Sequence, residues 1–189
     1  MRSKLLGCAL LAVCLLRGSS AATAAPVSPP GALEVPRVLT GDGPNWFAER
    51  YALAIEVLGP NVPAAKLRDV ALSILAQWAH ESARGRSEFC FNLGGWRARA
   101  KDRYFVARDN LGEPGKFRWT AYQDLPNAVA DQLQRLHDRF PVAWKQLVAQ
   151  PTSSAWVEQL GRSGYYTAKP ADYARAWAMN RAELGRLVA

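Results

Sequence analysis

The most informative stretch of this chain is Gln77-Trp78-Ala79-His80-Glu81-Ser82-Ala83-Arg84-Gly85-Arg86-Ser87. It completes a segment in which apolar residues recur at helical spacing, at Leu67, Val70, Ala71, Ile74 and Trp78. Pro63 opens this predicted helix, and Gly85 lies just beyond its end. Position 81 continues the inward-facing stripe, so Glu81 is predicted on the last helical turn, beside Trp78.

A carboxyl group at this place is expected to have a raised pKa. Partial burial and the negative end of the helix dipole both disfavour its ionised form. A carboxyl that stays protonated near neutral pH can protonate the leaving-group oxygen of a glycosidic bond. The helical periodicity by itself favours a structural, non-catalytic role for Glu81, in which its carboxylate pairs with Arg84, Arg86 or a backbone donor.

The segments around this helix predict a mainly helical α+β domain. A helix is expected from Phe47 to Leu58, ended by Gly59-Pro60. Two aromatic-rich segments at 104–108 and 117–122 flank a loop with two glycines and a proline, which predicts a β-hairpin. Three or four helices follow, with starts predicted at Asp124-Leu125-Pro126, Pro141, Ser154 and Pro170.

Four segments in a fixed order resemble the motifs of one enzyme family. Residues 77–87 resemble A-Q-x-A-x-E-S-x-W-G-x-S, and residues 91–96 resemble Y/F-N-L-F-G-I. Residues 117–128 are similar to F-R-x-Y-x-S-x-x-E-A, and residues 164–174 to G-Y-A-T-D-P-x-Y-A. This ordered set, covering roughly residues 64 to 187, is identified with glycoside hydrolase family 73 (endo-β-N-acetylglucosaminidases and flagellar-type muramidases) of the lysozyme-like superfamily.

The resemblance implies a lysozyme-like, two-lobed fold in which Glu81 is the general acid beside a small β lobe. The family's second carboxylate has its best counterpart in Asp109, which would act as a base or stabilise the transition state. Glu113 and, more weakly, Asp102 are alternatives for this role. The N-acetyl group of the substrate can also serve as the nucleophile, which relaxes the need for a second acid.

The same motifs imply further site residues. Tyr165 is predicted to be catalytic, because it matches the tyrosine that lines the family's cleft near the acid; the alternative is a packed aromatic residue. The expected substrate-binding residues are Ser82, Asn92, Gly95, Trp96, Trp119 and Tyr166. Asn92 could instead cap a turn, and both tryptophans could belong to the core. Two family residues are replaced here, a tryptophan by Arg84 and a phenylalanine by Gly94.

The N-terminal residues predict export. Arg2 and Lys4 precede a short apolar run, and Ala22-Thr23-Ala24 supplies small residues for cleavage, so residues 1–24 are predicted to be a signal peptide. Residues 25–44 are rich in proline and glycine and are predicted to be an extended linker before a domain at 45–189. The expected location is secreted or periplasmic, without stable membrane insertion; lipidation of Cys8 is the alternative.

Charge and cysteine content narrow the possible partners. Loss of Arg2, Lys4 and Arg17 would reduce the formal charge from +8 to +5, which suits attraction to an anionic cell wall. The basic residues are dispersed, so no nucleic-acid partner is expected. Cleavage leaves Cys90 as the single cysteine, so no internal disulfide is expected.

The predicted function is therefore an exported peptidoglycan hydrolase that cleaves β-1,4 glycosidic bonds of glycan strands without a cofactor or metal. A cysteine peptidase using Cys90 with His80 or His137 is an alternative from another class. A lytic transglycosylase is the nearest enzymatic alternative, although the G-L-M-Q stretch typical of that group is missing. A cell-wall-binding module with impaired catalysis is the non-enzymatic alternative.

Overall fold

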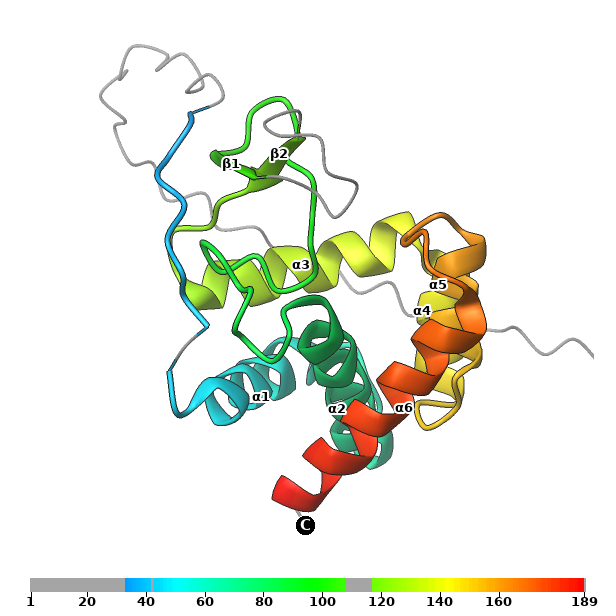
Figure 1. Cartoon of the computed structure of the whole chain (residues 1–189). Coiled ribbons are helices and arrows are strands. Elements are labelled where there is room, and N and C mark those ends of the chain that lie inside the picture. Colours follow the sequence, from blue (N-terminus) through cyan, green and yellow to red (C-terminus); the bar gives the residue numbers. More distant parts are fainter. Residues whose placement is uncertain (1–32, 42, 108–116, 189) are drawn as a thin grey trace, which may run out of the picture.

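Helix α2 (Ala64–Glu81) occupies the centre of the structure, a computed structural model that describes residues 33–41, 43–107 and 117–188. Residues 70–79 of this helix are all buried. The helix packs against α1 on one side and α6 on the other, and also meets α4 (Figure 1). A helix that is buried on every face belongs to the core, so its last residue, Glu81, is carried on a rigid element.

The remaining helices are α1 (Trp46–Leu58), α3 (Leu125–Arg139), α4 (Pro141–Ala149), α5 (Ala155–Arg162) and α6 (Pro170–Leu187). Prolines stand in the first turn of α3, α4 and α6, where the missing N–H group breaks no hydrogen bond within the helix. The Asp124 side chain caps α3 by accepting a hydrogen bond from the backbone N–H of Asn127 at 2.9 Å. The predicted starts of these helices are confirmed, as is the mainly helical α+β class.

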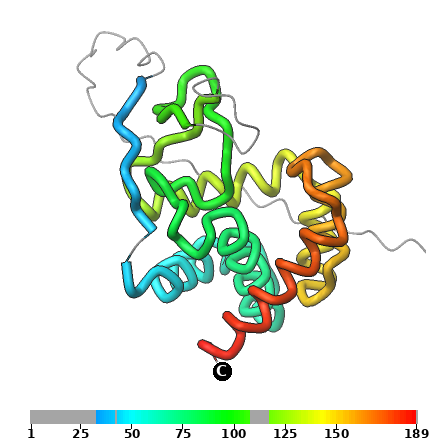
Figure 2. Tube along the Cα trace, viewed as in Figure 1, coloured from blue at the N-terminus to red at the C-terminus, as the bar shows by residue number. Residues whose placement is uncertain are grey.

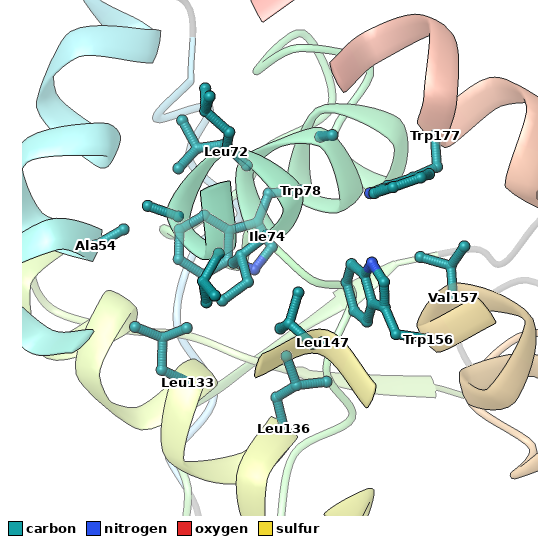
Figure 3. Close-up of a cluster of buried hydrophobic side chains, with 14 of the residues drawn as sticks. Ala54, Leu72, Ile74, Trp78, Leu133, Leu136, Leu147, Trp156, Val157 and Trp177 are labelled. Atoms are coloured by element: carbon teal, nitrogen blue, oxygen red, sulfur yellow. The ribbon is translucent and has the colours of Figure 1, made fainter. Parts of the chain in front are cut away.

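Three tryptophans of the main core come from the helices that meet here: Trp78 from α2, Trp156 from α5 and Trp177 from α6 (Figure 3). Trp156 and Trp177 meet edge to face with their ring centroids 6.0 Å apart, and the Trp177 Nε1 donates to the backbone oxygen of Ser73 at 2.9 Å. Each large apolar side chain buried in this way contributes about 1.5–3 kcal/mol. This packing fixes α6 against α2 and hence against the helix end that carries Glu81.

The small β lobe contains strands β1 (Tyr104–Ala107) and β2 (Phe117–Thr120), paired antiparallel with Tyr104 opposite Thr120. It has a separate small core of Cys90, Phe105 and Ala121. The predicted hairpin is confirmed, but its second strand ends at Thr120 rather than Tyr122. Tyr122 leaves the sheet because its N–H donates to the Cys90 carbonyl at 3.0 Å and its hydroxyl donates to Asp131 on α3 at 2.7 Å.

An N-terminal strap, residues 33–41, runs from the β lobe toward the start of α1 (Figure 2). The N–H of Tyr104 donates to Leu33 at 2.9 Å, and the N–H of Thr40 donates to Glu88 at 2.9 Å. A Cβ placed on Gly41 would lie 2.3 Å from the Gly85 carbonyl oxygen, so two backbones touch here. Residues 33–41 fall within the predicted linker at 25–44, and the hydrogen bonds and the backbone contact above bind them to the domain.

The predicted signal peptide at 1–24 and the possible lipidation of Cys8 lie outside the described residues. Among the helices that the structure describes, none is both long and apolar enough to cross a membrane.

Candidate active site

Helix α2 ends at Glu81 because the chain turns sharply after it. The N–H of Ser82 still donates to Trp78 at 2.9 Å, as in a helix. Ala83 and Arg84 then adopt positive φ angles of 48° and 57°, and Gly85 follows at 87°. Left-handed residues terminate a helix by redirecting its backbone, so the Glu81 side chain is presented at the helix end.

The Glu81 carboxyl group stands between α2, the first turn of α6 and the loop at residues 92–96. Its Oε1 accepts a hydrogen bond from the Tyr173 hydroxyl at 2.6 Å. Its Oε2 faces Gly95, since a Cβ built on that glycine would lie 3.5 Å from it. Gly95 itself is exposed to solvent.

Burial raises the pKa of Glu81 from 4.5 to about 6, although the hydrogen bond from Tyr173 and, to a smaller extent, the nearby Gln77 amide act in the opposite direction. The side chain keeps some contact with solvent, but the dense packing around the carboxyl makes desolvation the largest effect. The raised pKa has the direction that the sequence predicted. A carboxyl with this pKa holds a proton in a useful fraction of molecules near neutral pH.

Tyr165, predicted to be catalytic, does not bond to Glu81. Its hydroxyl donates to the Gly94 carbonyl at 2.6 Å and accepts from the Gln77 amide at 2.8 Å. The tyrosine that contacts the acid is Tyr173, which sequence reasoning did not select. A signal was present, because Tyr173-Ala174 matches the last letters of the G-Y-A-T-D-P-x-Y-A motif.

The loop at residues 92–96 is held from inside. The Asn92 side chain donates to the Trp96 carbonyl and accepts from the Trp96 N–H, both at 2.8 Å. Asn92 therefore fastens this turn, which was the alternative to sugar binding. The Trp96 ring is buried and lies edge-on to Tyr165 with centroids 5.4 Å apart, so it packs in the core. Gly94 has no room for the family's phenylalanine, because a Cβ there would meet the Trp96 Nε1 at 2.8 Å.

The other predicted substrate-binding residues divide into two groups. Trp119 is half-buried, and its ring lies 3.8 Å from the Cβ position of Gly95, on the same side as the acid. Tyr166 stacks on Tyr173 at 3.8 Å between centroids and donates its hydroxyl proton to Val157. The Ser82 hydroxyl donates to Trp78 and accepts from Gly85 within the turn. Gly95 and Trp119 thus lie beside the acid, whereas Tyr166 and Ser82 brace its surroundings.

Asp109 and Glu113, the candidates for a second carboxylate, lie outside the described residues. Asp102 is described, and it belongs to an ion-pair network with Arg135 at 2.8 Å and Arg99 at 3.0 Å. Burial acts to raise the pKa of Asp102, but hydrogen bonds from Arg99 and Arg135 outweigh it and hold the pKa below the usual value. Asp102 therefore serves the packing of the β lobe on α3.

The Cys90 thiol and the rings of His80 and His137, the groups of the cysteine-peptidase alternative, each contact other partners. The Cys90 sulfur contacts Pro36 and Val38 of the strap at 3.5 Å. The His80 ring packs edge-on against Tyr173 at 4.5 Å, and burial lowers its pKa. His137 is exposed and meets Asp138 at 2.7 Å. Within residues 33–41, 43–107 and 117–188, no group of three His, Cys, Asp or Glu residues could hold a metal ion.

The sequence did not predict a buried ion pair that joins α1 to the segment after Glu81. Arg50 of α1 binds both carboxylate oxygens of Glu88, at 2.5 and 3.0 Å, and the Trp46 Nε1 donates to the same carboxylate at 2.7 Å. Glu88 is fully buried. This cluster ties the segment that follows Glu81 to α1.

No protein-family model matches the chain, and the search of curated proteins gave no match. Among solved structures, the chain is similar to the peptidoglycan hydrolase from Sphingomonas sp. A1, with a TM-score of 0.59 and 20% identity over 75% of this chain and 91% of that chain. A glutamate-to-alanine variant of that hydrolase gives a TM-score of 0.56 and 21% identity over 74% and 90%. This likeness shows that the chain shares the fold of that hydrolase.

Proposed function

We propose that this protein is an exported peptidoglycan hydrolase that cleaves β-1,4 glycosidic bonds, with Glu81 as the general acid. The observation that carries the proposal is the Glu81 carboxyl group itself. It ends a rigid buried helix, its pKa is raised to about 6, and its Oε2 faces the exposed Gly95. The shared fold with a peptidoglycan hydrolase supports the substrate class.

Hydrolysis requires a proton for the leaving-group oxygen. It also requires a second group that acts as a base or stabilises the transition state at the sugar carbon. Glu81 supplies the proton, because burial keeps part of the population protonated near neutral pH. Asp109 is the proposed second carboxylate, with Glu113 and the substrate's own N-acetyl group as alternatives. Trp119, whose ring lies beside Gly95 and Glu81, is proposed to stack on a sugar ring.

Export and cleavage of the signal peptide after residue 24 are part of the proposal. They rest on the basic, apolar and small-residue order of the N-terminal sequence. Amino-terminal sequencing of the protein recovered from the cell envelope or medium tests them. Ala25 or Pro26 is expected as the first residue, and an intact Met1 would contradict export and cleavage.

Digestion of purified peptidoglycan, followed by mass spectrometry of the products, tests the activity. Reducing-end N-acetylglucosamine is expected from a glucosaminidase, and reducing-end N-acetylmuramic acid from a muramidase. Anhydro-muramyl ends would identify a lytic transglycosylase instead. Binding without any cleavage would favour the impaired cell-wall-binding module.

Glu81→Gln is expected to abolish cleavage while the fold is kept, because glutamine retains the shape of the side chain but cannot donate a catalytic proton. Circular dichroism and thermal unfolding check the fold of the variant. Full activity in Glu81→Gln would end the assignment of this residue.

A further inference from the structure

The two oxygens of the Glu81 carboxyl group have different surroundings. Oε1 is enclosed by α6, where it accepts a hydrogen bond at 2.6 Å from Tyr173, a side chain that is only 3% exposed. Oε2 faces Gly95, a residue that is exposed to solvent. The asymmetry bears on how the acid works, and the following inference rests on the proposed function.

Gln77 sets the direction of the hydrogen bonds around the acid. It lies one helical turn before Glu81 and is 2% exposed. Its amide nitrogen donates to the hydroxyl of Tyr165 at 2.8 Å and to the hydroxyl of Tyr173 at 3.3 Å. An amide NH₂ group only donates, so each tyrosine accepts from Gln77 and keeps its own proton for another partner.

Those other partners are acceptors. Tyr165 gives its proton to the Gly94 carbonyl oxygen at 2.6 Å, and a carbonyl oxygen can only accept. Tyr173 in the same way gives its proton to Oε1 of Glu81. If Oε1 carried the acid proton, that proton would point at the hydrogen that the Tyr173 hydroxyl already donates to Oε1. The acid proton of Glu81 therefore belongs on Oε2.

We propose that Gln77 and Tyr173 are positioning residues that keep Oε1 as an acceptor, so that Oε2, beside Gly95, is the oxygen that transfers the catalytic proton. The proton of Oε2 passes to the glycosidic oxygen, which also takes the electron pair of the breaking C–O bond. The charge left on the carboxylate is stabilised at Oε1 by the Tyr173 hydroxyl. Water then supplies the hydroxyl group on the sugar carbon, and its other proton returns to Oε2.

The packing around Tyr173 makes a conservative test possible. The ring is stacked on Tyr166 at 3.8 Å and 2° and touches the edge of His80 at 4.5 Å, and neither contact needs the hydroxyl. The titratable groups that interact with Glu81 are Tyr165, Tyr166 and Tyr173, with His80 adjacent to Tyr173. Gly95 adds none from the loop side. Tyr173→Phe therefore removes one hydrogen bond and keeps the packing.

The test combines the pH profile of peptidoglycan cleavage with a carbon-13 NMR titration of the Glu81 carboxyl group. In Tyr173→Phe, the pKa of Glu81 and the alkaline limb of the profile are expected to rise by about one pH unit, because a bond that favours the charged form is lost. The rate on the acidic plateau is expected to fall about ten-fold. The ratio of variant to wild-type activity should recover as the pH rises, which a merely structural defect does not produce.

Gln77→Met is a second variant, which leaves both tyrosines in place, and it is expected to raise the pKa of Glu81 as well. Tyr122→Phe is the matched control, because it removes a similar hydroxyl–carboxylate bond, at 2.7 Å to Asp131. The control should leave the Glu81 titration and the position of the alkaline limb unchanged.

The outcomes separate this inference from the proposed function. An unchanged Glu81 titration in Tyr173→Phe overturns the positioning role even if the wild-type protein cleaves peptidoglycan. A raised titration in a protein whose wild type cleaves nothing supports the arrangement of the carboxyl group and overturns the proposed function.

Discussion

At the scale of single residues, the site depends on one carboxyl group held in a place that disfavours its charge. Burial raises the pKa of Glu81 to about 6, and α2 and α6 enclose Oε1. Such a group reduces the stability of the folded state wherever it is ionised. Under the proposed function, this position favours catalysis over stability, as is common at active sites.

The cost of this arrangement depends on pH. The pKa of Glu81 is about 6 in the folded protein against an ordinary value of 4.5. Between these two pKa values the folded state binds more protons than the unfolded state. Stability is therefore lost as the pH rises from below 4.5 through 6. Glu81→Gln lacks this loss, so at pH 8 it should be more stable than the wild type by about 1–2 kcal/mol. Urea unfolding at pH 4 and pH 8 measures the difference, which should nearly vanish at pH 4.

Gly95 offers a second test at this scale. It has a φ of 62°, and a methyl group there would lie 3.5 Å from the Glu81 Oε2. Gly95→Ala should cost about 1–2 kcal/mol of stability through the left-handed backbone and should also lower cleavage by crowding the acid. Thermal unfolding and the rate of peptidoglycan digestion measure the two effects.

Gly164→Ala is the control, because Gly164 has a φ of 80° and nothing within 4 Å of its Cβ position. It should lose similar stability but keep its activity. Equal loss of activity in both variants would show that backbone strain alone explains the effect at Gly95.

At the scale of elements, the end of α2 is fixed by partners on three sides. Helix α6 supplies Tyr173, helix α1 supplies Arg50 for the buried Glu88, and the loop at 92–96 supplies Gly95. Arg84 binds Glu183 of α6 at 2.5 Å. The element that carries the acid is therefore held by packing and by ion pairs, one of which is fully buried.

The buried pair should be far more important than exposed ones. Arg50→Met leaves the Glu88 carboxylate buried without its cation, so it should cost about 3–5 kcal/mol of folding free energy. Arg50→Met combined with Glu88→Gln should recover part of that loss, because the uncompensated charge is gone. Arg175→Ala, which breaks an exposed pair with Asp172, should change stability by less than about 1 kcal/mol. Denaturant unfolding compares the three, and equal losses would contradict this ranking.

At the scale of the whole molecule, the helical lobe and the β lobe are joined by the strap at residues 33–41. The strap pairs with β1 and then crosses the turn that follows Glu81, where Gly41 touches Gly85. It is therefore a structural part of the site, because it holds the turn against the body of the domain.

Gly41→Ala should separate the strap from this turn. The new Cβ would lie 2.3 Å from the Gly85 carbonyl and 2.5 Å from its Cα, and neither backbone atom can move without disturbing the helix end. A loss of about 1–3 kcal/mol is expected, as in other overpacked sites, together with reduced cleavage. Gly43→Ala meets nothing within 4 Å and should unfold at or slightly above the wild-type temperature. Identical behaviour of the two variants would contradict the bracing role of the strap.

The sequence by itself determined the local structure and the position of the acid. Periodicity, prolines and the Asp124 cap act within a few residues, so they predicted the helices, the hairpin and Glu81 on the last turn of its helix. The same reasoning placed the second strand two residues too far, because the interactions of Tyr122 with Cys90 and Asp131 are not local.

Only the tertiary structure decided how the other residues are used. Tyr165 and Tyr173 carry the same chemical group, and their roles differ because the hydroxyl of one reaches Gly94 and that of the other reaches Glu81, 92 positions away in the chain. The bracing roles of Asn92 and Ser82 and the strap at 33–41 likewise depend on which backbone groups packing leaves without partners. Hydrogen bonds between distant segments follow from three-dimensional packing, and the spacing of residues along the chain does not contain that information.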